Sequence, residues 1–196
     1  MIELLSRYPA LSYCEKSICD ALDLMINTYK NGGKILVCGN GGSAADSEHI
    51  VGELMKAFIK KREVNDKRLP QKFQGLLQYG LPAISLPSQS AILSAYINDV
   101  SPEMMFAQLV YGYGKENDLL IGISTSGNSQ NVVNAVELAN CIGVKTLSMT
   151  GCKASKMSEI STVTIQVPEI ETYKIQELHL PVYHYLCAKT EAYFFN

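Results

Sequence analysis

Two residues able to do acid–base or metal chemistry lie four positions apart, His49 and Glu53. On a helix this spacing puts both side chains on one face. A carboxylate can remove a proton from a carbon atom, and the pair offers one nitrogen and one oxygen ligand to a metal ion. The pattern HxxxE differs from HExxH, so a zinc peptidase is not predicted.

The other two histidines of the chain, His179 and His184, share one segment with Gln176 and Glu177. A single histidine on a helix is more often a core or surface residue than a catalytic one. Taken with the first pair, however, Glu53 and His184 form a candidate acid–base couple. The candidate nitrogen and oxygen ligands of a metal ion are His49, Glu53, Gln176 and His184.

The spacing of Gln176 and His184 restricts how they could share an ion. Eight residues of regular helix span about 12 Å. We expect a shared ion only if both side chains lean together, if Pro181 kinks the helix, or if the contributing helices come from different subunits. In each case we expect the site near a subunit interface.

Hydroxyl groups concentrate in one segment between an apolar strand and a helix, Ser124-Thr125-Ser126-Gly127-Asn128-Ser129. Hydroxyls and the free N–H groups of a helix N-terminus can bind a phosphate without lysine. The P-loop pattern GxxxxGK[ST] is absent, so nucleoside triphosphate hydrolysis is not predicted. Helix capping accounts for one serine but not for four hydroxyls, which predicts a phosphate-monoester site.

An earlier turn, Gly39-Asn40-Gly41-Gly42-Ser43-Ala44, matches GxGxxA after a strand. A dinucleotide site also needs an acid about 20 residues on, and the nearest candidate, Glu63, lies in a basic loop. A dinucleotide site is therefore not predicted. Either the glycines let a ligand approach the backbone at a helix N-terminus, or the turn is only a tight connection with Ser43 as N-cap.

Short apolar runs, turns and helical segments recur along the chain, and this pattern is typical of a parallel α/β sheet. The strands and helices that it predicts must position the candidate site residues. The predicted strands span 34–38, 82–86, 118–123, 144–149 and 162–167. The predicted helices span 3–30, 44–60, 130–141 and 171–195. Pro181 is expected to kink the last helix or restart it, because proline removes one backbone hydrogen bond.

Length and composition exclude several classes of protein. A chain of 196 residues suits one domain, and 17 basic against 19 acidic residues argue against a general nucleic-acid binder. No apolar run approaches the roughly 20 residues of a membrane span, and the N-terminus does not resemble a secretory signal, so we expect a cytoplasmic protein. The six cysteines include no CxxC pair, and we expect free thiols.

The segment 60–80 interrupts the alternation of strands and helices. It concentrates six basic residues, Lys60, Lys61, Arg62, Lys67, Arg68 and Lys72. We favour a solvated helix end and loop over a basic lid or partner surface, because a run of like charges is usually solvated.

Three segments carry a family resemblance, CGNGGSAADSEHIVGEL, ISTSGNSQNVV and KIQELHLPVYH. In this order and spacing they resemble the sugar-isomerase (SIS) domain family, and within it the phosphoheptose isomerases, over essentially the whole chain. The resemblance implies a single SIS domain over 1–196, folded as a three-layer αβα, flavodoxin-like sandwich with a five-stranded parallel sheet and an extra N-terminal helix. It also implies a cytoplasmic homotetramer that interconverts sedoheptulose 7-phosphate and D-glycero-D-manno-heptose 7-phosphate, the first step toward ADP-heptose for lipopolysaccharide.

The resemblance also implies roles for single residues. Glu53 would be the base and His184 its acid partner, and one zinc ion per subunit would bind His49, Glu53, Gln176 and His184. The implied substrate contacts are Asn40, Gly41, Gly42, Ser43, Glu53, Asn98, Asp99, Ser124, Thr125, Ser126, Ser129 and Gln176. Asn98 and Asp99 are assigned by the resemblance alone.

The implied chemistry suits these groups. Aldose–ketose isomerisation moves a proton between two carbons through a cis-enediol, so it needs a carboxylate base and an acid that serves the oxygens. A zinc ion would stabilise the enediolate.

Four departures from the family pattern bear on substrate preference: the long basic segment, Gln89 in place of an aspartate, Val100-Ser101 after the Asn-Asp dipeptide, and Pro181.

Two other functions remain as alternatives. A non-catalytic SIS protein, either a sugar-phosphate sensor or an adaptor of the replication initiator, would keep the phosphate turn and lack the acid–base pair, whereas this chain has both Glu53 and His184. An isomerase or etherase acting on another phosphosugar, such as a hexosamine phosphate, is matched less well by the HxxxE and IQExHxxxxH segments. The sequence therefore favours an aldose–ketose isomerase.

Overall fold

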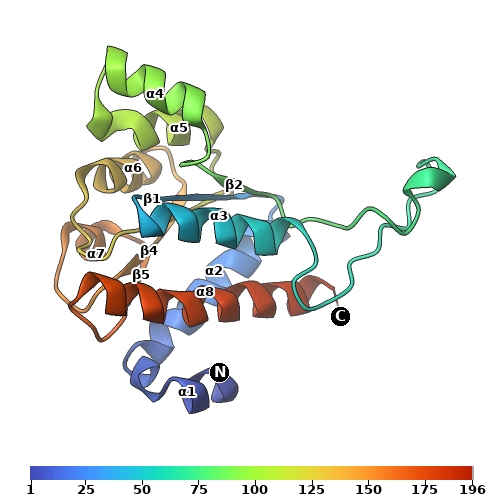
Figure 1. Ribbon diagram of the computed structural model, residues 1–196, viewed down its shortest axis with the longest axis horizontal. Coiled ribbons are helices and arrows are strands. Elements are labelled where there is room, and N and C mark those ends of the chain that lie inside the picture. Colours follow the sequence, from blue (N-terminus) through green and yellow to red (C-terminus); the bar gives the residue numbers. More distant parts are fainter. Residues whose placement is uncertain (196) are drawn as a thin grey trace.

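The computed structural model describes residues 1–195 and has a five-stranded, all-parallel sheet with strand order β2-β1-β3-β4-β5 (Figure 1). The strands are β1 (Ile35–Gly39), β2 (Ala83–Ser85), β3 (Leu119–Ile123), β4 (Lys145–Thr150) and β5 (Val163–Gln166). All five predicted strands are confirmed, with ends within one residue. No helix in residues 1–195 is long and apolar enough to cross a membrane.

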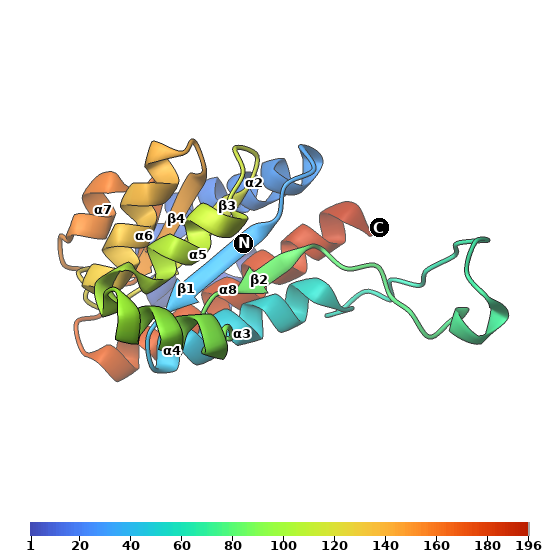
Figure 2. The same ribbon diagram turned by 90° about the horizontal axis from the view of Figure 1, so that it is seen from above.

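Alternate residues of the strands point into two separate apolar cores, because successive side chains of a strand face opposite sides. Ile35 and Val37 of β1 lie in one core, whereas Leu36 and Cys38 lie in the other. The first core is covered by α2 (Glu15–Lys30), α3 (Gly42–Met55) and α8 (Thr172–Phe194), and the second by α5 (Met105–Tyr113) and α6 (Gln130–Cys141). The predicted three-layer αβα sandwich is confirmed (Figure 2).

The N-terminal segment is not one helix over 3–30, and that prediction is wrong. It forms α1 (Ile2–Arg7), a 3-10 helix (Pro9–Cys14) and then α2. Tyr8, which precedes Pro9, has non-helical dihedrals of φ −131° and ψ 73°. A residue before proline is disfavoured in the helical region, which explains the break.

Three helices have no counterpart in the prediction: α4 (Ser90–Asp99), α5 and α7 (Lys156–Ile160). A 3-10 helix, Pro102–Met104, joins the first two. The helix α4 has no fully buried side chain, and its Leu93 packs partly buried against the second core. The helix α7 is only 5 residues long and begins with a capping box at Ser155.

The last helix runs without interruption past Pro181, so the expected restart of the helix is wrong. Proline costs one backbone hydrogen bond inside a helix. The neighbouring turns bury Ile175, Val182 and Leu186 against the sheet, and this packing holds the helix together across the missing bond.

Residues between α3 and β2 form an extended arm that projects from the body (Figures 1 and 2). The helix before it ends at Met55 and not near 60, because Lys56 is extended. The arm contains a short 3-10 helix (Gln71–Phe73) and one antiparallel bridge between Glu63 and Gln78. Five of its six basic side chains are exposed, but Arg62 is fully buried, so the solvated interpretation is wrong for that residue.

All six cysteines are free thiols, as predicted.

Candidate active site

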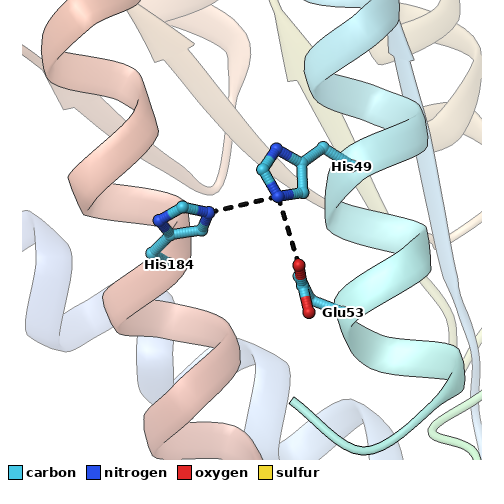
Figure 3. A group of neighbouring side chains, drawn as sticks. All are labelled: His49, Glu53 and His184. Carbon is cyan, nitrogen blue, oxygen red and sulfur yellow. Dashed lines mark hydrogen bonds and ion pairs between the residues drawn. The ribbon is translucent and has the colours of Figure 1, made fainter. Parts of the chain in front are cut away.

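Three predicted site residues meet between α3 and α8 (Figure 3). Nε2 of His49 lies 3.2 Å from Oε1 of Glu53 and 3.2 Å from Nε2 of His184. The three ligand atoms lie within 4.8 Å of one another, which is a geometry that can hold a metal ion. The structure thus places Glu53 and His184 in one cluster with His49.

The helix α3 presents this face to α8 because its neighbouring positions are used by the core. Ile50 and Leu54 are buried under the sheet, and each lies one residue after a site residue. One residue turns a helix by about 100°, so His49 and Glu53 emerge beside the core stripe. The contact between α3 and α8 then brings His184 opposite them.

The two carboxylate oxygens of Glu53 have different surroundings. Its side chain is only 15% exposed, and Oε1 faces His49 while Oε2 is buried without a hydrogen bond. The one cation near Oε2 in residues 1–195 is Lys56, whose Nζ is 3.6 Å away. Burial, and to a smaller extent the charge of His49, lowers the pKa of His184, and Glu53 opposes this shift. His184 is therefore suited to act as a neutral ligand or base.

Two residues that the sequence analysis did not select contact this cluster from behind. The Tyr183 hydroxyl donates to Oδ1 of Asp46 at 3.1 Å and lies 3.0 Å from Nδ1 of His49. Asp46 precedes His49 by three positions and is thus on the same helix face, which was the available signal. Burial raises the pKa of Tyr183 well above its ordinary value, with Asp46 adding to the effect, so the hydroxyl stays neutral.

The hydroxyl loop (124–129) lies at the carboxyl end of β3 and leads into α6. Oγ of Ser124 is 2.9 Å from Oγ of Ser129 and 3.4 Å from Oγ of Ser126. Ser129 occupies the N-cap position of α6, yet its side chain makes no capping bond. These hydroxyls face one another beside the N-terminus of a 12-residue helix, as the predicted phosphate site requires.

A small cavity of about 110 Å³ adjoins the hydroxyl loop. Thr125 and Ser126 line one side of it, and Gly151, Cys152 and Lys153 follow from the next strand along the sheet. A hydroxyl-lined hollow at this edge is where a ligand of an open parallel sheet is expected.

The glycine turn (39–44) lies next to the hydroxyl loop, because Gly39 pairs with Ile123 across the two central strands. The side-chain amides of Asn40 and Asn131 join the two by a pair of 2.9 Å hydrogen bonds. The two helices that follow leave toward opposite faces of the sheet, which makes this the topological switch point. Residues predicted from both turns are therefore gathered at one edge.

The glycine turn does not use Ser43 as a cap, so that interpretation is wrong. Gly41, at φ +56°, is the N-cap residue of α3, and Ser43 is buried within the first turn. Gly42 leaves room for the side chain of Gln176, since a Cβ there would lie 2.6 Å from its Nε2 and the amide would have to move away. The amide of Gln176 is thus placed at the glycine turn, on the first part of α8.

Asn98 and Asp99 lie at the exposed end of α4 and bond to each other, from Nδ2 to Oδ1, at 2.8 Å. Within residues 1–195 no hydrogen bond joins them to another predicted site residue. Gln89, one of the departures from the family pattern, precedes the same helix and accepts a 3.3 Å bond from the Tyr113 hydroxyl.

His184 also borders a larger groove of about 890 Å³. The groove lies between α1, the root of the arm and α8, and its lining includes Leu4, Tyr8, Phe58, Leu180 and Pro181. The histidine therefore connects the Glu53 cluster to a groove lined by apolar residues together with charged residues such as Arg7 and Lys189.

Comparison with known proteins agrees with this geometry. The SIS domain family model matches residues 10–151. The phosphoheptose isomerase of Helicobacter pylori strain Shi470 is 41% identical over 187 residues, which is 95% of this chain and 89% of that protein.

Solved structures give the same result. The phosphoheptose isomerase of Neisseria gonorrhoeae superposes with a TM-score of 0.80 at 31% identity, covering 97% of this chain and 94% of that one. The enzyme of Francisella tularensis superposes with a TM-score of 0.81 at 29% identity, covering 97% and 92%. The chain belongs to the SIS domain family and, within it, to the phosphoheptose isomerases.

Proposed function

We propose that the chain interconverts sedoheptulose 7-phosphate and D-glycero-D-manno-heptose 7-phosphate in the cytoplasm, as the first step toward ADP-heptose. The observation that supports this best is the convergence of Glu53 and His184 on one nitrogen of His49. A sugar-phosphate sensor or an adaptor needs no such cluster. The hydroxyl loop supports a phosphorylated substrate, and the relatives support the seven-carbon sugar.

In this proposal the carboxylate of Glu53 takes the proton from C2 of the aldose or C1 of the ketose. The electron pair of that C–H bond becomes the C1–C2 double bond of the enediol, and Glu53 returns the proton to the other carbon. His184 moves the proton between the two oxygens. Each positioned acid or base is worth about 10²–10⁴ in rate.

The residues present also suit a divalent cation. His49, Glu53 and His184 supply two nitrogens and one oxygen, which is the donor set that zinc prefers. A bound zinc ion would act as a Lewis acid on the substrate oxygens and stabilise the enediolate. We propose one such ion per subunit, with Gln176 as the fourth ligand.

The positions of these groups favour an active site shared between subunits. Along α3, Glu53 lies eleven residues beyond Gly42, which corresponds to about 16 Å. From C2 to phosphorus an extended heptose phosphate spans about 8 Å, at about 1.2 Å per bond. The glycine turn and Glu53 of one chain are therefore farther apart along α3 than one substrate spans, and Gln176 is about 12 Å along α8 from His184.

We therefore propose a homotetramer in which the hydroxyl loop, glycine turn and Gln176 of one subunit face the Glu53 cluster of another. The groove beside His184 supports an interface there, because apolar surface rimmed by charged residues often marks an interaction site.

The proposal is tested with purified, chelator-treated protein and sedoheptulose 7-phosphate, with and without added zinc. We expect formation of the aldose 7-phosphate, faster with zinc, and no reaction with unphosphorylated sedoheptulose. Tight binding of the sugar phosphate without turnover in either sample would favour the sensor or adaptor. Faster turnover of a hexosamine phosphate would favour the other phosphosugar isomerase.

A further inference from the structure

We propose that Tyr183 and Asp46 are positioning residues that hold His49 in the tautomer able to bind a metal ion. This inference rests on the metal site of the proposed function and adds two residues to it. Tyr183 lies between the other two, with its hydroxyl oxygen 3.1 Å from Oδ1 of Asp46 and 3.0 Å from Nδ1 of His49. The tyrosine and histidine rings also pack edge to face, with centroids 5.4 Å apart.

The direction of the two hydrogen bonds follows from counting protons. A neutral tyrosine hydroxyl has one proton to donate, and a carboxylate has none. Tyr183 must therefore donate to Asp46, and its oxygen is left to accept from Nδ1–H of His49. A neutral imidazole carries one N–H, so Nε2 of His49 then presents a lone pair.

That lone pair points at the centre of the cluster. Nε2 of His49 is 3.2 Å from the Oε1 acceptor of Glu53, and two acceptors at this distance repel unless a proton or cation lies between them. Nε2 of His184 converges on the same point from α8. The hydrogen bonds behind His49 thus prepare its front nitrogen as a ligand.

Loss of the Tyr183 hydroxyl would remove this preference. Nδ1 of His49 would have no fixed acceptor, and the ring could carry its proton on Nε2, where the metal ligand is needed. Partners that orient a metal-binding histidine in this way are typically worth about 10–100-fold in metal affinity.

The test compares Tyr183→Phe with Tyr185→Phe, which removes one hydroxyl from the same helix. Tyr185 accepts from the N-terminal amine of Met1 and does not contact the cluster through its hydroxyl. Zinc affinity is measured on the substrate-free protein by competition with a chromophoric chelator. We expect Tyr183→Phe to weaken zinc binding about 10–100-fold and Tyr185→Phe to leave it unchanged.

The role of Asp46 gives a second, independent comparison. In Asp46→Asn the amide oxygen can still accept from Tyr183, so zinc affinity should stay near that of the wild type. In Asp46→Ala the Tyr183 proton is free to be donated to Nδ1, so affinity should fall as far as in Tyr183→Phe. The double variant Tyr183→Phe, Asp46→Ala should be no worse than either single one, because both act through the same nitrogen.

The kinetic readout separates positioning from folding. At subsaturating zinc, kcat should fall in Tyr183→Phe while KM for the sugar phosphate stays constant, and excess zinc should restore kcat. Unchanged zinc affinity in both Tyr183→Phe and Asp46→Ala would overturn the inference. If the variants show the expected zinc affinities but the wild type isomerises no sugar phosphate, the inference on Tyr183 and Asp46 is supported and the proposed function is contradicted.

Discussion

Arg62 and Glu191 form a fully buried ion pair, with Nε of the arginine 2.8 Å from Oε1 of the glutamate. Glu191 also accepts from the backbone N–H groups of Phe58, Ile59 and Lys60. The guanidinium donates to the carbonyl oxygens of Leu54 at 2.6 Å and of Glu53 at 3.2 Å. One pair therefore ties the last helix to the end of α3, where the proposed base lies, and to the root of the arm.

Breaking this pair should cost much more than breaking a surface pair. Glu191→Gln leaves a buried guanidinium without a counter-charge, and we expect the free energy of unfolding to fall by about 3–5 kcal/mol. Glu137→Gln is the control, because it removes an exposed pair with Lys156 and should cost at most about 1 kcal/mol. Urea unfolding measures both. Equal small losses would show that the buried pair is dispensable.

The hydroxyl loop should govern substrate affinity and not the proton transfer. Ser124→Ala with Ser129→Ala removes two hydroxyls that we assign to the phosphate, each worth about 1.5–3 kcal/mol against a charged group. KM should therefore rise by about 100-fold or more, with kcat nearly unchanged. Ser94→Ala, on the exposed α4, is the control and should leave both constants as they are. An unchanged KM in the double variant would contradict the phosphate assignment.

A shared active site predicts complementation between two impaired variants at a sugar-phosphate concentration well below the raised KM of the Ser124→Ala, Ser129→Ala variant. Co-expression of that variant with Glu53→Gln should restore about a quarter of the wild-type sites, because each restored site combines the intact half of one chain with the intact half of another. Glu53→Gln with His184→Gln should restore nothing, because both changes damage the same half. Absence of recovery in the first mixture would place each site within one chain.

His179 should make the protein less stable in mild acid. It is fully buried, with Nε2 3.3 Å from the Thr150 carbonyl oxygen, and burial lowers its pKa to about 4 despite that bond. Between this pKa and the unfolded value of about 6.5 only the unfolded chain binds the proton, so the free energy of unfolding falls as the pH falls.

From about pH 7.5 to about pH 5 we expect His179 to account for a loss of about 2 kcal/mol. His179→Gln can still donate to Thr150 but does not titrate. Between the two pH values the variant should therefore lose about 2 kcal/mol less unfolding free energy than the wild type. Urea unfolding at the two pH values measures this. The same pH dependence in both proteins would assign the effect to other groups.

The sheet and the main cluster could be predicted from the sequence because their signals are local. Apolar runs followed by glycine or serine turns gave the five strands, and the spacing of His49 and Glu53 placed both on one helix face. Arg62 could not be distinguished from its basic neighbours, since its partner Glu191 lies 129 residues away. The role of Tyr183 depends on how α8 is rotated against α3, which no local pattern records. Asn98 and Asp99 came from the family resemblance alone.

In the proposed mechanism Glu53 transfers a proton between C1 and C2 of a heptose 7-phosphate. The most direct measurement is proton NMR of the wild type, Glu53→Gln and Glu48→Gln with sedoheptulose 7-phosphate in deuterated water. We predict aldose 7-phosphate carrying deuterium at C2 from the wild type and from Glu48→Gln, and a rate about 10²–10⁴-fold lower from Glu53→Gln. Wild-type rates of deuterium incorporation in Glu53→Gln would contradict the account.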